Sequence, residues 1–191
     1  MRMTLTLALG AILGFGLTLL PNLLRRTEAA SAPELRAPPA RTGRVRLHTH
    51  EEFKFVASAP IHVTAPLFGA ERERVWAPDW DPKFVWPENP NDQEGMVFTL
   101  AHGGKTATWV NTSFDLEANR IQYVYVIPDT LVTVVTVTLT ANAKTTDVAV
   151  AYDRTALTET ANIVVREMAE RDANAGPEWG KQINGYLRTR S

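Results

Sequence analysis

The sequence predicts an α+β domain in which a curved antiparallel β-sheet wraps around a long C-terminal helix. Three β-branched apolar stretches follow one another between Arg120 and Asp153, and they run directly into an amphipathic helical pattern that continues almost to Ser191. The connections between these stretches are too short for parallel crossovers, so the strands must be antiparallel neighbours. The chain has 191 residues, 45% of them hydrophobic and 21% charged, which is the composition of one ordinary globular domain.

Residues 1–32 are expected to form a membrane anchor or a signal segment. The stretch 4–24 carries no charge and is long enough to cross a hydrocarbon core of about 30 Å. We favour a retained anchor because this stretch is longer than the core of a usual signal peptide, and because Arg25 and Arg26 precede the small-residue cleavage site at 30–32. The protein would then be membrane-associated through residues 4–24. A cleaved signal would instead export it to the periplasm or the outside.

The side of the membrane on which the domain lies stays open at this point. Arginines are more numerous after the apolar stretch than before it, and the positive-inside rule then keeps the domain cytoplasmic, whereas the signal-peptide interpretation places it outside. Residues 33–47 form a linker, in which Pro33, Pro38 and Pro39 favour an extended, solvated chain. The folded domain is expected over residues 48–188.

The domain begins with a strand and a short helical segment. Alternation predicts a strand over Glu51 to Ala57, and the apolar run Ile61 to Phe68 predicts one or two helical turns that end at Gly69. The next segment, through Pro87, holds three of the five tryptophans, and its prolines preclude a long helix. Turn signals then separate five further expected strands, at Met96–Leu100, Thr106–Phe114, Arg120–Ile127, Leu131–Thr140 and Thr145–Asp153.

The last part of the chain supplies a cover for one face of this sheet. Val135 and Val137 share a face of their strand, opposite a face of threonines, so one side of the sheet is dry. A helix that begins after an N-cap at Thr155 can cover that side. The helical pattern is interrupted at Gly176–Pro177, where the helix is expected to bend or break. Its apolar stripe comprises Leu157, Ala161, Val164, Val165 and Met168.

At this point the chain resembles the SRPBCC superfamily, which comprises the START and birch-pollen-allergen-like (Bet v 1-like) helix-grip proteins. It is similar to an uncharacterised bacterial branch of that superfamily. The resemblance implies a helix-grip fold with an apolar cavity between the sheet and the last helix, which different members use for lipids, sterols, polyketides or other aromatic compounds. The matching strings are Gly69–Trp80, Gly95–Phe98, Thr108–Val110 and Tyr152–Leu157.

Ten residues are candidates for the lining of such a cavity. They are apolar or aromatic and lie on the expected inner faces of the strands, the tryptophan-rich segment and the helix. Alternation shows only which residues share a face, so plain core packing is the alternative for each. The ten candidates are Trp76, Trp80, Phe98, Trp109, Tyr123, Tyr125, Val135, Val137, Val164 and Met168.

The sequence assigns no metal site, cofactor or catalytic residue. No cysteine is present, which excludes disulfides and cysteine-based metal sites, and the His48–His50 pair lacks a third ligand. The acids Glu71, Glu73, Asp79 and Asp81 alternate with arginines and are interpreted as solvated ion pairs, and His102 is expected to have a packing or turn role. The formal net charge of −1, with no basic face, excludes nucleic acid as a partner. No glycine-rich phosphate loop is present.

Three functions therefore remain after the sequence is considered. The first is the binding of an apolar small molecule or lipid in the cavity, without catalysis. The second is a cyclase- or hydratase-type enzyme, in which Tyr123, Tyr125, Tyr152 or a carboxylate steers proton transfer on a ligand in the same cavity. The third is a structural domain with a filled core.

Overall fold

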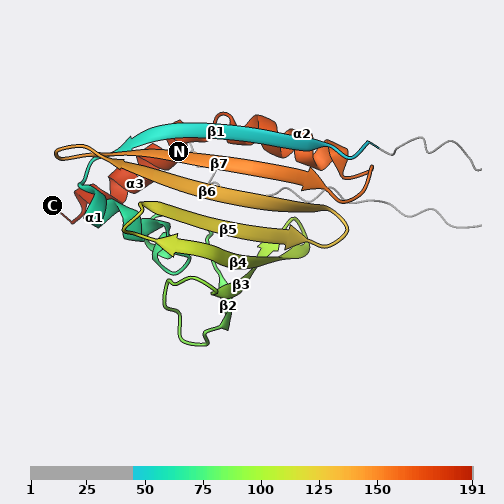
Figure 1. Ribbon diagram of the computed structural model, residues 1–191, viewed down its shortest axis with the longest axis horizontal. Coiled ribbons are helices and arrows are strands. Elements are labelled where there is room, and N and C mark those ends of the chain that lie inside the picture. The colour runs from blue at the N-terminus through green and yellow to red at the C-terminus, as the bar shows by residue number, and fades with distance from the viewer. Residues whose placement is uncertain (1–44, 191) are drawn as a thin grey trace, which may run out of the picture.

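The computed structural model describes residues 45–190, and its main feature is one curved sheet of seven antiparallel strands (Figure 1). The strands are β1 (His48–Ala57), β2 (Lys83–Trp86), β3 (Val97–His102), β4 (Lys105–Asp115), β5 (Arg120–Ile127), β6 (Leu131–Ala141) and β7 (Thr146–Ala156). Between β1 and β2 lie three single turns of helix, α1 (Ile61–Thr64), η1 (Ala65–Phe68) and η2 (Arg72–Val75). Two longer helices, α2 (Asn162–Asp172) and α3 (Gly176–Arg188), close the chain.

The strand order is β1-β7-β6-β5-β4-β3-β2, so the sheet is a meander from β2 to β7 and the first strand closes it beside the last. Every neighbouring pair is antiparallel, as the short connections require. The predicted fold class, a curved antiparallel sheet with C-terminal helices, is confirmed.

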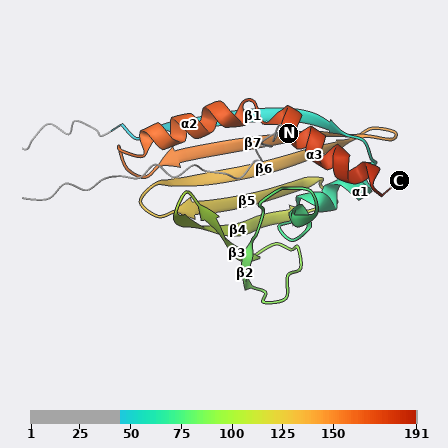
Figure 2. The same cartoon turned by 180° about the vertical axis from the view of Figure 1, so that it is seen from behind.

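Two helices cover the sheet in place of one continuous helix. Both lie along the β1 and β7 side of the sheet, while the segment between α1 and β2 lies over the β3 to β5 side (Figure 2). The expected break is where α3 begins, with Gly176 at its first position and a proline next to it. A Cβ at Gly176 would lie 2.7 Å from the carbonyl oxygen of Lys54, so only glycine lets α3 come this close to β1.

Two details of the helical prediction are wrong. Thr155 is not a helix cap, because it lies in β7 and pairs with His48 of β1. The helix begins only at Asn162, and Leu157 is in the turn before it, where its amide donates to the carbonyl oxygen of Thr130. The first strand begins three residues earlier than expected, and its additional pairing extends β7 into the region assigned to the helix.

The edge strand β2 was not predicted. Pro82 and Pro87 flank this strand, and a short stretch between two prolines is typical of a loop in sequence analysis. The strand pairs on one side only, with β3, and the pairing has a register shift between Phe84 and Trp86. Proline has no backbone N–H to donate, and it is tolerated here because an edge strand forms hydrogen bonds to only one neighbouring strand.

The anchor or signal segment, residues 1–32, lies outside the described residues, as does the linker 33–47 apart from residues 45–47. Among residues 45–190, no helix is long and apolar enough to span a bilayer. The interpretation of residues 4–24 as a membrane segment therefore stays a prediction.

Candidate functional site

A cavity of about 590 Å³ lies between the concave face of the sheet, the segment around η2 (residues 69–82, the η2 segment) and the two C-terminal helices. Its wall includes aromatic residues from four strands, from the η2 segment and from α3, together with several polar side chains. The cavity is inconsistent with the filled core that the sequence left open. Its lining comprises Glu73, Trp76, Ala77, Asp79, Trp80, Phe98, Leu100, Ala101, His102, Trp109, Tyr123, Tyr125, Val135, Val137, Tyr152, Arg154, Met168, Glu170, Arg171, Asp172, Asn174, Ala175, Glu178, Trp179 and Gln182.

One row of directly paired residues crosses the sheet wall of the cavity. Its members, from β3 to β7, are Phe98, Trp109, Tyr125, Thr133 and Arg154. The first three form an aromatic stack, with ring centroids 5.7 Å apart between Phe98 and Trp109 and 4.1 Å apart between Trp109 and Tyr125. The row is therefore aromatic at its β3 end and polar at its β7 end.

The wall opposite the sheet is built by three further tryptophans. The indole N–H of Trp76 donates to the carbonyl oxygen of Leu67, and that of Trp80 to the carbonyl oxygen of Ala70, each at 2.7 Å. Trp179 of α3 packs on Trp76, with ring centroids 5.3 Å apart. These contacts satisfy the polar ends of Trp76 and Trp80 and leave their apolar faces to the cavity.

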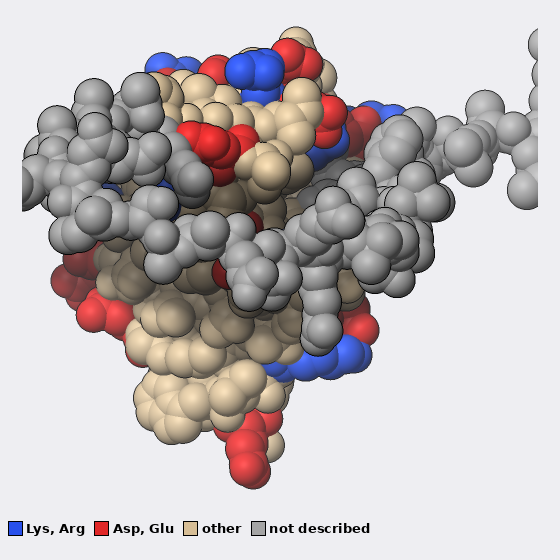
Figure 3. Space-filling model, turned by 90° about the vertical axis from the view of Figure 1, so that its right-hand side faces the viewer, with Lys and Arg blue, Asp and Glu red and all other residues tan. Residues whose placement is uncertain are grey.

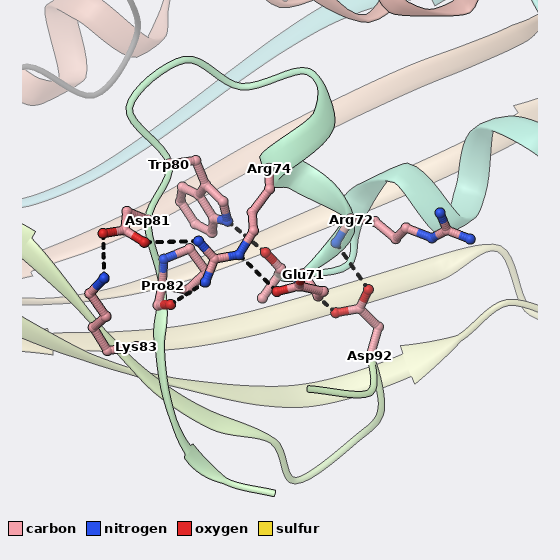
Figure 4. Close-up of polar contacts among 9 residues, drawn as sticks. Glu71, Arg72, Arg74, Trp80, Asp81, Pro82, Lys83 and Asp92 are labelled. Atoms are coloured by element: carbon pink, nitrogen blue, oxygen red, sulfur yellow. Dashed lines mark hydrogen bonds and ion pairs between the residues drawn. The ribbon is translucent and has the colours of Figure 1, made fainter. Parts of the chain in front are cut away.

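Arg74 holds the η2 segment in place from its outer side (Figure 4). Its guanidinium donates to Glu71 and Asp81, each at 2.8 Å, and to the carbonyl oxygen of Pro82. Asp92 accepts from the backbone amides of Glu71 and Arg72, at 2.9 and 3.2 Å. These bonds tie together the segment that carries Trp76 and Trp80.

Glu73 corrects the prediction that the acids of this segment are solvated. Glu71 and Asp81 are indeed ion-paired near the surface, with Arg74. Glu73, by contrast, is only 8% exposed and lines the cavity. Burial, and secondarily the nearby charge of Asp92, raises the pKa of the Glu73 carboxyl well above its ordinary value. This side chain can therefore act as a protonated hydrogen-bond donor.

His102, for which only a packing or turn role was expected, also lines the cavity. Its Nε2 atom is buried and has no hydrogen-bond partner among residues 45–190. Burial, and secondarily the positive charges of Arg154 and Arg171, lowers the pKa of His102 to about 4. The imidazole is thus uncharged at neutral pH.

Arg154 is a buried guanidinium in the cavity wall, 3% exposed. It forms an ion pair with Asp172 of α2, and its guanidinium carbon lies 4.4 Å from the centroid of the Tyr152 ring. A third contact, 3.5 Å long, runs to the hydroxyl of Tyr125. The ion pair links the sheet to the end of α2.

The three tyrosines considered for proton transfer all lie in the cavity wall. The hydroxyl of Tyr123 donates to the carbonyl oxygen of Phe68 at 2.9 Å. Burial raises the pKa of the hydroxyls of Tyr123 and Tyr152, so both stay protonated at neutral pH.

Nine of the ten residues proposed as cavity lining lie in this wall, and Val164 does not. Residues Val165, Met168 and Ala169 are the buried side of α2, which leaves Val164 half-buried beside them. The proposed lining lacked Glu73, His102, Arg154 and Trp179. Strand alternation contained a signal for one of these, because Arg154 shares a face with Val148 and Val150 of β7.

His48 and His50 form hydrogen bonds between β1 and the neighbouring strand β7. The two rings contact Thr155 and Asp153 of the neighbouring strand, at 2.9 and 2.7 Å. Within residues 45–190, no group of three histidine, aspartate or glutamate side chains is placed to hold a metal ion.

No protein-family model matches the chain, and no curated protein matches it. Solved structures do resemble it. A structure of norcoclaurine synthase from Thalictrum flavum, in complex with dopamine and hydroxybenzaldehyde, has a TM-score of 0.57 at 9% identity and covers 84% of this chain and 99% of its own. An aromatase/cyclase from Streptomyces sp. R1128 has a TM-score of 0.55 at 13% identity and covers 76% of this chain and 97% of its own.

A protein from Rhizobium loti gives a third match, with a TM-score of 0.53 at 16% identity, covering 75% of this chain and 99% of its own. Identities this low show a shared fold and nothing more. The chain therefore has the helix-grip fold of these proteins.

Proposed function

We propose that this protein binds an apolar, ring-bearing small molecule or lipid in the cavity without converting it, as a member of the bacterial helix-grip branch that it resembles. The observation that carries the proposal is the cavity itself. Its volume of about 590 Å³ lies in the range of small-molecule sites, and its wall combines aromatic side chains with a few polar groups. Tryptophan and tyrosine rings on facing walls favour flat, apolar ligands.

The similar structures support this proposal in kind. Norcoclaurine synthase holds two small aromatic compounds, dopamine and hydroxybenzaldehyde, and the Streptomyces protein is an aromatase/cyclase. A protein with this fold thus holds aromatic compounds although it is only 9% identical to this chain.

The direct test is native mass spectrometry and organic extraction of protein purified from its own host, followed by titration with the neutral fluorescent probe N-phenyl-1-naphthylamine. We expect a stoichiometric apolar compound, or saturable probe binding by the emptied protein. Absence of both would overturn the proposal.

A pair of variants on β6 assigns the binding to this cavity. Val135 faces the cavity, and its neighbour Val134 faces the other side of the sheet. Val135→Trp fills part of the cavity and should weaken probe binding at least tenfold, whereas Val134→Trp should leave it unchanged. Equal effects of the two substitutions would place the probe elsewhere.

An enzymatic role is the second candidate, and Glu73 is the observation that favours it. A buried, protonated carboxyl in the cavity wall is suited to general acid catalysis, as a cyclase or hydratase requires. The extracted ligand, incubated with the protein in deuterated water, would then gain deuterium at carbon, and Glu73→Gln would abolish the exchange. If the mass of the ligand does not change with the native protein, the enzymatic role is rejected and binding without catalysis remains.

The sequence of residues 4–24 further leads us to propose that the cavity operates next to a membrane. When host cells are fractionated, the full chain should be recovered with the membranes. A shortened chain that begins at Pro33 should be recovered in the soluble fraction. Recovery of the full chain in the soluble fraction would exclude an anchor.

A further inference from the structure

One part of the cavity wall differs chemically from the rest. His102 at the end of β3, Tyr125 of β5 and Arg154 of β7 line it together, although they come from distant parts of the sequence. The rings of His102 and Tyr125 have centroids 6.0 Å apart, and Arg154 contacts the Tyr125 hydroxyl. We refer to these three residues as the polar end of the cavity.

The polar end has unused hydrogen-bonding atoms. The Nε of Arg154 and the Nε2 of His102 are buried, and neither has a partner among residues 45–190. Because the hydroxyl of Tyr125 accepts from Arg154, its own proton is available to donate. Buried polar groups without partners are costly, so a ligand group that pairs with them gains binding energy.

We infer that the ligand is an amphipathic acid, whose anionic head group lies against Arg154, Tyr125 and His102 and whose apolar body lies among the tryptophans. This inference rests on the proposed function, because it names the class of molecule that the cavity binds. The Nε–H of Arg154, the hydroxyl of Tyr125 and, in the tautomer with its proton on Nε2, the ring of His102 can donate to the oxygens of a carboxylate. A hydrogen bond to a charged oxygen is stronger than one to a neutral oxygen.

The charges around the polar end favour an anion. Asp172 is paired with Arg154, and Arg171 is a second positive group of the wall. The wall also carries the acids Glu73, Asp79, Glu170 and Glu178, of which Glu73 is kept protonated by burial and Asp79 and Glu170 are exposed, as Arg171 is. At His102 the positive groups prevail, because the charges of Arg154 and Arg171 both lower its pKa.

His102 gives this inference a pH dependence. A bound anion beside its ring stabilises the imidazolium, so binding should be accompanied by proton uptake and should strengthen as the pH falls. Five titratable or charged groups surround His102: Arg154, Arg171, Asp172, Tyr125, and Lys105, which pairs directly opposite it and donates to Thr130.

Two probes that differ in one charge test the inference. 1-Anilinonaphthalene-8-sulfonate and N-phenyl-1-naphthylamine share the same ring skeleton, and only the first carries an anionic group. We expect the folded protein to bind the sulfonate about tenfold more tightly than the neutral probe at low ionic strength. This preference should increase between pH 8 and pH 5, and His102→Leu should remove the increase.

The decisive variant removes the positive group without leaving a lone buried charge. In Arg154→Met/Asp172→Leu, both members of the ion pair become apolar, which cores tolerate well. The two probes should then bind with similar affinity, while neutral-probe binding shows that the cavity is intact. The matched control Arg120→Gln changes an exposed arginine that does not line the cavity, and it should keep the preference.

The outcomes separate this inference from the proposed function. Equal binding of the two probes by the native protein would overturn the inference and leave an apolar binding site. An anion preference that survives in the double variant would also overturn it. Failure of both probes to bind would reject the proposed function together with the inference.

Discussion

The indole ring of Trp109 stacks on the phenol ring of Tyr125, with centroids 4.1 Å apart and planes inclined by 22°. The two residues are direct partners on β4 and β5. Trp109 also meets the ring of Trp80 edge-on, at 5.7 Å, so it connects the sheet wall of the cavity to the η2 segment. One side chain thus contributes to the core, to the cavity and to the attachment of that segment.

Trp109→Ala should be among the most destabilising single changes in the domain. The indole is only 9% exposed, and its removal enlarges the cavity and deletes four ring contacts. We expect a loss of about 3–5 kcal/mol in the free energy of unfolding, measured by urea denaturation. Trp86→Ala is the matched control, because Trp86 is 54% exposed, and it should cost far less. Similar losses for both variants would contradict the central role of Trp109.

His102 should titrate far below His50. Burial lowers its pKa to about 4, whereas the hydrogen bond to Asp153 raises the pKa of His50 above 6.5. In a proton NMR titration, the ring resonance that disappears in His102→Gln should have its midpoint near pH 4. A midpoint near 6.5 would show that the ring is solvated and would remove the electrostatic basis of the polar end.

The same shift has a consequence for stability. The pKa of His102 is lower in the folded protein than in the unfolded chain. Its contribution to the free energy of unfolding is therefore complete above pH 6.5 and is lost as the pH falls toward 4. His102→Gln should therefore reduce the loss of stability between pH 6.5 and pH 4, in denaturant titrations at several pH values. An unchanged pH profile would contradict this prediction.

The sequence predicts the sheet and most of the apolar wall because both follow from a local rule. Alternation along a strand places Val135 and Val137, or Tyr123 and Tyr125, on one face, and neighbouring strands then build the wall. The helix start was wrong for a non-local reason. The pairing of Thr155 with His48 extends β7 into the region assigned to the helix, and the two residues are far apart in the sequence.

The same rule places Tyr125 and Arg154 on the inner face of their strands, but it could not predict that His102 and Arg154 line one end of the cavity together. His102 and Arg154 come from β3 and β7, which have three strands between them in the sheet, and the pKa of His102 also depends on Arg171 of α2. Glu73 looked like the ion-paired acids around it, because only the fold of the η2 segment turns this one side chain inward. Such residues are identified by burial, which the sequence pattern alone does not give.

Gly69→Ala should loosen the η2 segment without backbone strain. The added methyl group would lie 2.2 Å from the carboxylate of Asp92, which would have to move and give up its bonds to the amides of Glu71 and Arg72. We expect a loss of about 1–3 kcal/mol in unfolding free energy and weaker probe binding. Gly185→Ala is the control, since its nearest neighbouring atom is 3.9 Å away and alanine favours a helix. Equal stability of both variants would show that Asp92 does not hold the segment.

Glu73→Gln should stabilise the protein at neutral pH and not in acid. Burial raises the pKa of the folded Glu73 carboxyl above its ordinary value of 4.5, so in the window above that value the unfolded chain loses a proton that the folded chain keeps. The free energy of unfolding then falls by up to about 1.4 kcal/mol for each pH unit in that window, and glutamine removes this penalty. Denaturant titrations should show no gain for the variant at pH 4 and an increasing gain toward pH 7. Glu94→Gln, at an exposed position, should follow the native profile, and a gain at pH 4 equal to that at pH 7 would mean that the Glu73 carboxyl is ionised in the folded protein.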